Sequence, residues 1–296
     1  MSDSLKIRVQ SPGMFTSLQD LGRNGNQDSG VPFGGAMDKE SHKIANELLD
    51  NQRSEPTIEM TYLGATFEFE GEGQIAITGA DMGAKLNNNP VAMYKTIDVQ
   101  NGDVLSFGQA QLGCRTYLGV KGEWQAPKWL DSFSVVSNLT DLDGIPKPLK
   151  KDDELEVKIL SFIPNRKYPI GSIPVYSSCH IIRVITGPEF ERFSIEQMQS
   201  FFQKVFTVSP DSNRMGYRLE GELKDYVTKR EEISSGIVEG TIQITKSGKP
   251  IILTADAQTT GGYPRIANVV RDDLSRVGQM KAGDEVKFML VNLSEL

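Results

Sequence analysis

The chain has 296 residues, with 32 Lys or Arg against 39 Asp or Glu, which gives a net charge of −7 at neutral pH. So acidic a chain is a poor candidate for binding nucleic acid or an anionic membrane, and no apolar run approaches the length that spans a bilayer. Two cysteines argue against a disulfide framework and residues 1–6 lack a signal-peptide profile, so we expect a soluble cytoplasmic protein.

Three helices are predicted among many short strands, in a mainly β fold. The first helix covers residues 38–49 and places His42 among charged neighbours, which predicts a solvated side chain. A capping box at Ser194 begins the second helix, and a third, short helix begins near Asp273. Strands are expected at residues 75–78, 104–107, 181–185, 251–253 and 286–290. With two histidines in the chain, no metal site is expected.

An internal repeat predicts two similar units. The matching segments are residues 57–64 with 241–248, residues 99–107 with 280–288 and, more loosely, residues 20–23 with 213–216. Segments that recur in the same order along a chain indicate an internal duplication. A Pro-rich stretch between the two halves suggests a domain boundary near residue 170. We therefore expect a β-barrel unit over residues 1–170 and a second over residues 171–296, because closing a barrel hides the edges of its strands.

The first of three polar, glycine-rich segments covers residues 11–38. Arg23 is suited to binding an anion, and Asp20 or Asp38 is suited to accepting hydrogen bonds from a ligand. The alternative is an ordered loop in which Arg23 pairs with Asp20. The sequence leaves both interpretations open.

The second segment carries two arginines, Arg214 and Arg218, which lie four residues apart beside Asn213. Paired guanidinium groups could clamp a carboxylate or a phosphate. Surface arginines on a loop are an equally good interpretation.

The third segment covers residues 254–264. Its Asp256 comes just after the apolar run 251–253 and therefore lies at a strand end. Its neighbours combine hydrogen-bonding side chains with glycines that permit close approach of the backbone: Gln258, Thr259, Thr260, Gly261, Gly262 and Tyr263. This density of donors and acceptors favours a functional site. By contrast, residues 247–250 only resemble the end of a phosphate-binding loop, and a hairpin turn is expected there. Cys114 is expected in the core.

Taken together, these segments resemble the KipA family, also called the 5-oxoprolinase C subunit, the second subunit of allophanate hydrolase or the biotin-dependent carboxyltransferase domain. The resemblance is carried by residues 11–13, 16–23, 30–32, 35–38, 45–46, 213–219, 240–243 and 256–264. Two positions depart from the family pattern. Phe133 replaces an arginine within residues 131–134, and Ile244 with Thr245 replaces a hydrophobic–Pro pair.

The resemblance implies two cyclophilin-like β-barrel units and two partner subunits, one of the KipI type and one of the LamB/YcsF type. The expected reaction is the ATP-dependent opening of 5-oxo-L-proline to L-glutamate, with ATP and magnesium bound with the partner subunits and no covalent cofactor in this chain. The expected catalytic residues are Asp256, Arg214 and Asp38. The expected substrate-binding residues are Gln19, Asp20, Arg23, Arg218, Gln258, Thr259, Gly261, Gly262 and Tyr263.

Two alternatives remain open at this point. One is carboxyl transfer to a urea-like or amide-like acceptor, with a biotinylated partner. The other is non-enzymatic, in which the chain binds a KipI-like kinase inhibitor and antagonises it.

Overall fold

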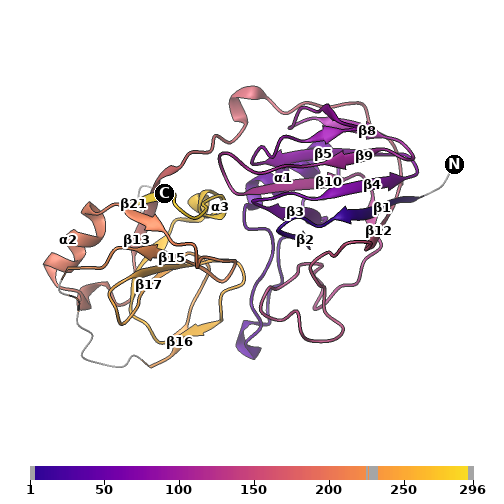
Figure 1. Ribbon diagram of the computed structural model, residues 1–296. Coiled ribbons are helices and arrows are strands. Elements are labelled where there is room, and N and C mark those ends of the chain that lie inside the picture. Colours follow the sequence, from indigo (N-terminus) through magenta and orange to yellow (C-terminus); the bar gives the residue numbers. More distant parts are fainter. Residues whose placement is uncertain (1–3, 225, 227–232, 293–296) are drawn as a thin grey trace. The chain divides into compact units, whose positions relative to one another are not determined.

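The computed structural model describes residues 4–224, 226 and 233–292, and it divides into two compact units (Figure 1). The first unit comprises Met1–Arg23 and Gly34–Tyr176, and the second comprises Asn24–Phe33 and Ser177–Leu296. The outer ends of the two predicted units, residues 1–3 and 293–296, lie outside the described residues. Among the helices that are described, none is long and apolar enough to cross a membrane.

Two antiparallel sheets and one helix form the first unit. Its strands are β1 (Ser4–Ser11), β2 (Phe15–Gln19), β3 (Thr57–Thr61), β4 (Thr66–Glu70), β5 (Gly73–Gly79), β6 (Lys85–Leu86), β7 (Asn89–Pro90), β8 (Thr96–Val99), β9 (Val104–Ser106), β10 (Arg115–Val120), β11 (Glu123–Trp124) and β12 (Glu154–Lys158). One sheet has the order β11-β12-β1-β4-β9-β6-β7 and the other has the order β2-β3-β10-β5-β8.

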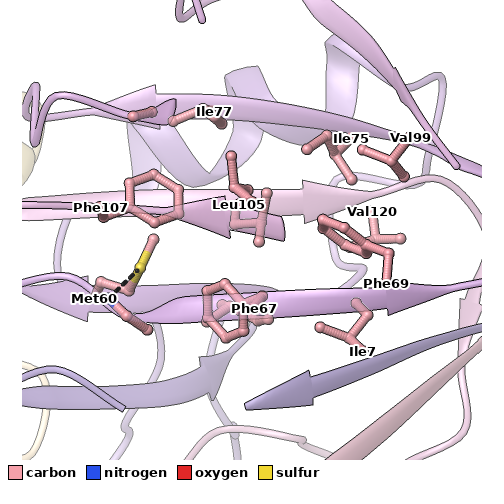
Figure 2. Packing of buried hydrophobic residues seen from close by; sticks show 14 of the residues in the cluster. Ile7, Met60, Phe67, Phe69, Ile75, Ile77, Val99, Leu105, Phe107 and Val120 are labelled. Carbon is pink, nitrogen blue, oxygen red and sulfur yellow. Dashed lines mark hydrogen bonds between the residues drawn. The ribbon is translucent and has the colours of Figure 1, made fainter. Parts of the chain in front are cut away.

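The core of the first unit is aliphatic and aromatic (Figure 2). On β4, Phe67 and Phe69 point inward and are fully buried, whereas Glu70 at the end of the strand is exposed. This alternation is what the period of two along a strand dictates. Phe67 meets Phe107 edge to face, with the ring centroids 6.4 Å apart, an arrangement that aromatic pairs prefer.

The predicted first helix is confirmed as α1 (Lys39–Leu48), with Asp38 as its N-cap. Its apolar face, which includes Ile44 and Leu48, packs against Ala76 of β5. In this way the helix fixes the segment that precedes it, residues 34–38, against the second sheet.

The second unit contains a closed barrel of seven strands in the order β13-β20-β17-β18-β15-β14-β21. These strands are β13 (Cys179–Thr186), β14 (Phe206–Val208), β15 (Gly216–Glu220), β17 (Thr241–Ile244), β18 (Pro250–Leu253), β20 (Arg265–Val269) and β21 (Glu285–Leu290). A short pair, β16 (Ser235–Gly236) with β19 (Thr260–Gly261), lies outside the barrel. A parallel pairing of β13 with β21 brings the first and last strands of the unit together.

Two helices and the 3-10 turns complete the structure. They are α2 (Ile195–Gln203), α3 (Leu274–Gly278), η1 (Gln27–Ser29), η2 (Ile170–Ser172), η3 (Phe190–Arg192) and η4 (Arg271–Asp273). The predicted capping box at Ser194 is present at the start of α2. Phe201 of α2 stacks on Phe288 of β21 with 4.6 Å between the ring centroids, so this helix covers the barrel with its aromatic face.

The mainly β class and the predicted strands and helices are confirmed. The closed barrel is found in the second unit, whereas the first unit folds as two separate sheets. Cys114 is buried, as predicted, and residues 245–249 form the turn of the β17–β18 hairpin.

One part of the sequence repeat, residues 99–107 with 280–288, is matched by two similar turns. The carboxylate of Asp103 accepts a hydrogen bond from the backbone N–H of Gln100 at 2.8 Å, and that of Asp284 accepts one from Lys281 at 3.0 Å. Each turn then leads into a strand, β9 or β21. An Asp side chain that accepts a hydrogen bond from a nearby backbone N–H stabilises a turn. Both units therefore contain a turn that is stabilised in the same way.

Candidate functional site

In the first unit, the Asp20 carboxylate is buried and holds a neighbouring segment. Its Oδ1 accepts hydrogen bonds from the hydroxyls of Ser132 (2.7 Å) and Ser134 (2.5 Å) and from the backbone N–H of Gly22 (2.8 Å). Its Oδ2 accepts a bond from the backbone N–H of Phe133 at 2.8 Å. Asp20 is therefore a hydrogen-bond acceptor, as predicted, but the donors are protein groups, mainly those of residues 132–134.

The side chain of Arg23 is 2% exposed and points into the first unit. Its Nη2 donates to the carbonyl of Ser134 at 2.5 Å, and its guanidinium carbon lies 4.9 Å from the centroid of the Trp129 ring, a cation–π distance. Gln19 is also buried, and its amide donates to the carbonyl of Val135. The geometry favours an ordered loop, in which these polar side chains fix residues 129–135. The expected partners differ, because Arg23 bonds Ser134 whereas Asp20 bonds Gly22 and residues 132–134.

Asp38 is buried at the start of α1 and caps that helix. Its Oδ1 accepts hydrogen bonds from the backbone N–H groups of Glu40 and Ser41, which is the ordinary function of an N-cap aspartate. Its Oδ2 accepts a bond from the Ser41 hydroxyl at 2.7 Å and one from the hydroxyl of Tyr176 at 3.2 Å. Tyr176 thereby ties the end of the first unit to the start of α1.

A buried carboxylate that the sequence analysis did not select, Glu59, lies next to the Asp38 segment. It accepts hydrogen bonds from the backbone N–H of Met37 (2.9 Å) and from the hydroxyl of Tyr117 (2.8 Å), and the Nε of Arg115 lies 3.5 Å from it. Burial, followed by the charges of Glu59 and Asp38, raises the pKa of Tyr117 well above its usual value, so this hydroxyl stays protonated.

One signal in the sequence could have identified Glu59. It is a charged residue between apolar residues of a strand, and the internal repeat places Gln243 at the same position of the second unit. Gln243 is also buried, and its amide donates to the carbonyl of Tyr263 at 3.2 Å. A buried polar residue at the same position of both units, on the strand face opposite the apolar neighbours, indicates that it holds a loop.

The prediction of a solvated His42 is wrong. The side chain is fully buried, because this face of α1 packs on β3 and on the chain before it. Its Nε2 lies 3.1 Å from the carbonyl of Arg53 and its Nδ1 lies 2.9 Å from the hydroxyl of Thr57. A carbonyl can only accept, so Nε2 carries the proton and Nδ1 accepts. Burial lowers the pKa of His42 to about 4.

We expect the stability of the first unit to fall between pH 7 and pH 5. In this range the unfolded chain protonates His42, near its ordinary pKa of 6.5, whereas the folded chain keeps it neutral. Protons bound only by the unfolded state favour unfolding, so about 2 kcal/mol is lost by pH 5. Urea unfolding at both pH values measures the loss, which His42→Gln should largely abolish; an equal loss in that variant would assign the effect to other groups.

In the second unit, the structure brings Arg214 and Asp256 together as a buried, bidentate ion pair. Nε and Nη2 of the arginine donate to the two carboxylate oxygens, both at 2.9 Å. The side chains are 4% and 0% exposed. The backbone carbonyl of Arg214 also accepts bonds from the N–H of Asp256 and the hydroxyl of Thr254. Side chains and backbone therefore fasten the start of β15 to the end of β18.

The remaining predicted residues of the second unit lie nearer the surface. Arg218 is exposed on β15, on the face turned away from the barrel interior. Gln258 is exposed, Thr259 and the two glycines Gly261 and Gly262 are half-buried, and Tyr263 is 40% exposed. A Cβ on Gly261 would lie 2.6 Å from the amide nitrogen of Gln243, so a larger residue here would have to displace that side chain. These exposed groups are accessible to a ligand, whereas the buried Arg214–Asp256 ion pair is not.

The predicted catalytic residues therefore share one structural role. Asp38, Arg214 and Asp256 are all buried and bonded to protein groups. Protonating either carboxylate would weaken the hydrogen bonds by which it holds protein groups, so these bonds oppose proton transfer. The geometry thus favours these residues as supports for polar loops, and their catalytic assignment stays a prediction.

The comparisons with known proteins agree with this architecture along nearly the whole chain. Residues 29–290 match the model of the carboxyltransferase domain, subdomain A and B. The chain belongs to this family. It is 34% identical to the C subunit of the 5-oxoprolinase of Escherichia coli, over 98% of this chain and 92% of that protein. The resemblance inferred from the motifs is thereby confirmed.

Larger proteins of the family contain this chain's fold as one part. The urea amidolyase of Saccharomyces cerevisiae is 32% identical over 96% of this chain, which spans 16% of that protein. The solved structure of the Kluyveromyces lactis urea carboxylase is 30% identical, with a TM-score of 0.89, and the match covers 97% of this chain and 27% of that one. The carboxyltransferase domain thus occurs both as a chain of this length and within longer enzymes.

Proposed function

We propose that this chain is the C subunit of a cytoplasmic, ATP-dependent 5-oxoprolinase complex that hydrolyses 5-oxo-L-proline to L-glutamate. The observation that supports this most is the match in length and sequence to the E. coli C subunit, which extends over nearly all of both chains. The urea amidolyase relative is several times longer, so it supports the fold and the family more than the reaction.

The substrate of the proposed reaction has a carboxylate, a lactam carbonyl and one N–H group. The exposed donors and acceptors of Arg218, Gln258 and Tyr263 are suited to those groups. We propose that they contact substrate, and that the Arg214–Asp256 pair beneath them keeps their loops in place. Turnover is therefore expected to depend on the pair even if neither member touches the substrate.

A lactam is a poor electrophile, and ATP supplies the phosphoryl group that turns its oxygen into a leaving group. The buried arginines do not fit a nucleotide site in this chain, since Arg23 bonds Ser134 and Arg214 bonds Asp256. We therefore propose that ATP and magnesium are bound with the two partner subunits, of the KipI type and the LamB/YcsF type.

Reconstitution tests the proposal. The purified KipI-type and LamB/YcsF-type subunits are incubated with ATP and 5-oxoproline, and ADP release is measured with and without this chain. We expect 5-oxoproline-dependent release only when this chain is added. Release at the same rate without it would contradict the role as an obligatory subunit.

Carboxyl transfer is the second candidate, because the urea carboxylase structure is so similar in fold. In that case the three-subunit mixture would release no ADP with 5-oxoproline. Transfer of bicarbonate-derived label to urea, in the presence of ATP, a biotin carboxylase and a biotinylated carrier, would then depend on this chain. Tight binding of the KipI-type partner with neither activity would instead support the regulatory interpretation.

A further inference from the structure

The loop formed by residues 258–263 of the second unit carries Gln258 and Tyr263, two of the side chains proposed to contact substrate. Gln258 lies at its start and Tyr263 at its end, and both are exposed. The Arg214–Asp256 ion pair lies before the loop, so it fastens only the start. The position of Tyr263 therefore depends on what holds the end of the loop.

Gln243 of β17 lies on the outer face of the barrel. The residue before it, Ile242, pairs with Ile252 of β18, and both are fully buried, as expected of the barrel interior. Successive residues of a strand point to opposite faces, so the side chain of Gln243 points away from that interior. It is nevertheless only 1% exposed. Another part of the second unit must therefore cover it.

The 258–263 loop supplies this cover, and it contacts the carboxamide of Gln243 at two points. The Nε2 of Gln243 donates to the carbonyl of Tyr263 at 3.2 Å. Because a carbonyl only accepts, the nitrogen of the carboxamide and not its oxygen must face it. The backbone of Gly261 lies against the same nitrogen, since a Cβ at this position would be 2.6 Å from it. The absence of a side chain lets the loop approach so closely.

The strand pairing is irregular where the loop ends. Ile242 lies opposite Ala267 of β20, whereas Gln243 lies opposite Arg265, so that β20 has one extra residue, Ile266, at this point. Bulges of this kind are common at the rims of barrels and beside functional sites, where they redirect side chains. The loop therefore ends one residue before a bulge, with Gln243 on the facing strand.

We propose that Gln243 is a positioning residue, whose carboxamide N–H holds the Tyr263 carbonyl and thereby places the side chains of Gln258 and Tyr263 against 5-oxoproline. Gln243 does not touch the substrate itself, because the loop covers it. The inference rests on the proposed function for the identity of the substrate, whereas the contact between Gln243 and the loop does not depend on it.

Gln243→Met removes the donor and keeps most of the volume of the side chain. In the reconstituted mixture, we expect the KM for 5-oxoproline to rise about tenfold, as loss of one hydrogen bond predicts. The KM for ATP should change less than about twofold, because a displaced loop weakens binding of one substrate only. A fraction of misfolded chain would lower kcat and leave both KM values unchanged. Gln203→Met, at an exposed position of α2, is the control and should change neither KM by more than about twofold.

Gln243→Glu separates the hydrogen bond from the packing. An ionised carboxylate cannot donate to the Tyr263 carbonyl, whereas a protonated carboxyl group can. Burial raises the pKa of a carboxyl group, and the charged groups opposite, Arg265 and Glu189, already bond each other at 2.6 Å. We therefore expect the kcat/KM of this variant, divided by that of the unmodified chain at the same pH, to rise about tenfold from pH 8 to pH 6. For Gln243→Met and Gln203→Glu the same ratio should stay constant.

Hydrogen exchange of the chain alone gives a readout that needs no activity. In Gln243→Met, we expect the peptide that covers residues 258–263 to lose about tenfold in protection, while a peptide from β21 keeps its protection. Unchanged protection of the loop would overturn the role of Gln243 in holding it.

Two kinetic results would also overturn the proposal. One is a lower protection of the loop with an unchanged KM for 5-oxoproline, because the position of the loop would then not matter for the substrate. The other is a constant ratio for Gln243→Glu between pH 8 and pH 6, because the donor would then not be required. If the unmodified mixture shows no turnover that depends on 5-oxoproline, the proposed function is wrong, and with it the assignment of this loop to that substrate.

Discussion

Replacing Arg214 with methionine is expected to destabilise the second unit by about 3–5 kcal/mol. The substitution keeps the length and apolar part of the side chain but leaves the Asp256 carboxylate fully buried without its guanidinium partner. An isolated charge in the protein interior is far more costly than a well-bonded ion pair. Because β15 begins two residues after Arg214 and β18 ends three residues before Asp256, the change weakens two strands of the barrel at once.

The chain provides a matched control in Arg218→Met. This arginine is four residues away on the same segment but exposed, so its removal should change stability by less than about 0.5 kcal/mol. A double variant, Arg214→Met with Asp256→Leu, removes both charges and should be more stable than Arg214→Met alone. That ordering distinguishes a buried charge from a simple loss of packing.

The measurement has to report on the second unit by itself. Both tryptophans lie in the first unit, so their fluorescence does not follow the barrel directly. Hydrogen exchange of peptides from β15 and β18, at increasing urea concentration, gives the local stability of the strands involved. Equal protection in Arg214→Met and Arg218→Met would contradict the role of the ion pair.

The fold was largely predictable because local patterns and tertiary structure agree. The capping box at Ser194 predicted where α2 begins, and the β-rich runs at residues 104–107 and 286–290 predicted β9 and β21. Each of these signals depends on only a few neighbouring residues, so it can be recognised in the sequence alone. The arrangement of the first unit as two sheets depends on pairings such as β1 with β12, which are far apart in the chain and carry no local signal.

The motifs gave candidate site residues but not the partners of those residues, and the functional assignment of the candidates stays a prediction. The motifs identified Asp20, Arg23, Arg214 and Asp256, yet residue type alone did not show that the last two bond each other across 42 positions. His42 was misjudged for a related reason. The charged residues beside it in sequence lie on another face of α1, and burial depends on what packs against each face.

Replacing Asp20 with asparagine is expected to destabilise the first unit by about 3–5 kcal/mol, the second large effect. The carboxylate accepts four hydrogen bonds, from Gly22, Ser132, Phe133 and Ser134. Asparagine has the same shape but offers an NH₂ group in place of one oxygen, and that group cannot accept. Hydrogen bonds to a charged group are worth about 1.5–3 kcal/mol each, and a buried donor left without an acceptor adds its own cost.

Asp131→Asn is the control for this variant. Asp131 lies beside the same segment but is exposed, with a positive φ of 61°, a conformation in which asparagine is well tolerated. Its stability should therefore remain within about 0.5 kcal/mol of the unmodified chain. Urea unfolding followed by tryptophan fluorescence is suited to the comparison, because Trp129 pairs with Ser132 through the backbone and stacks on Arg23. If the urea midpoint of Asp20→Asn equalled that of Asp131→Asn, the four hydrogen bonds would contribute little net stability. The surrounding fold would then fix the position of Asp20 without depending on its bonds.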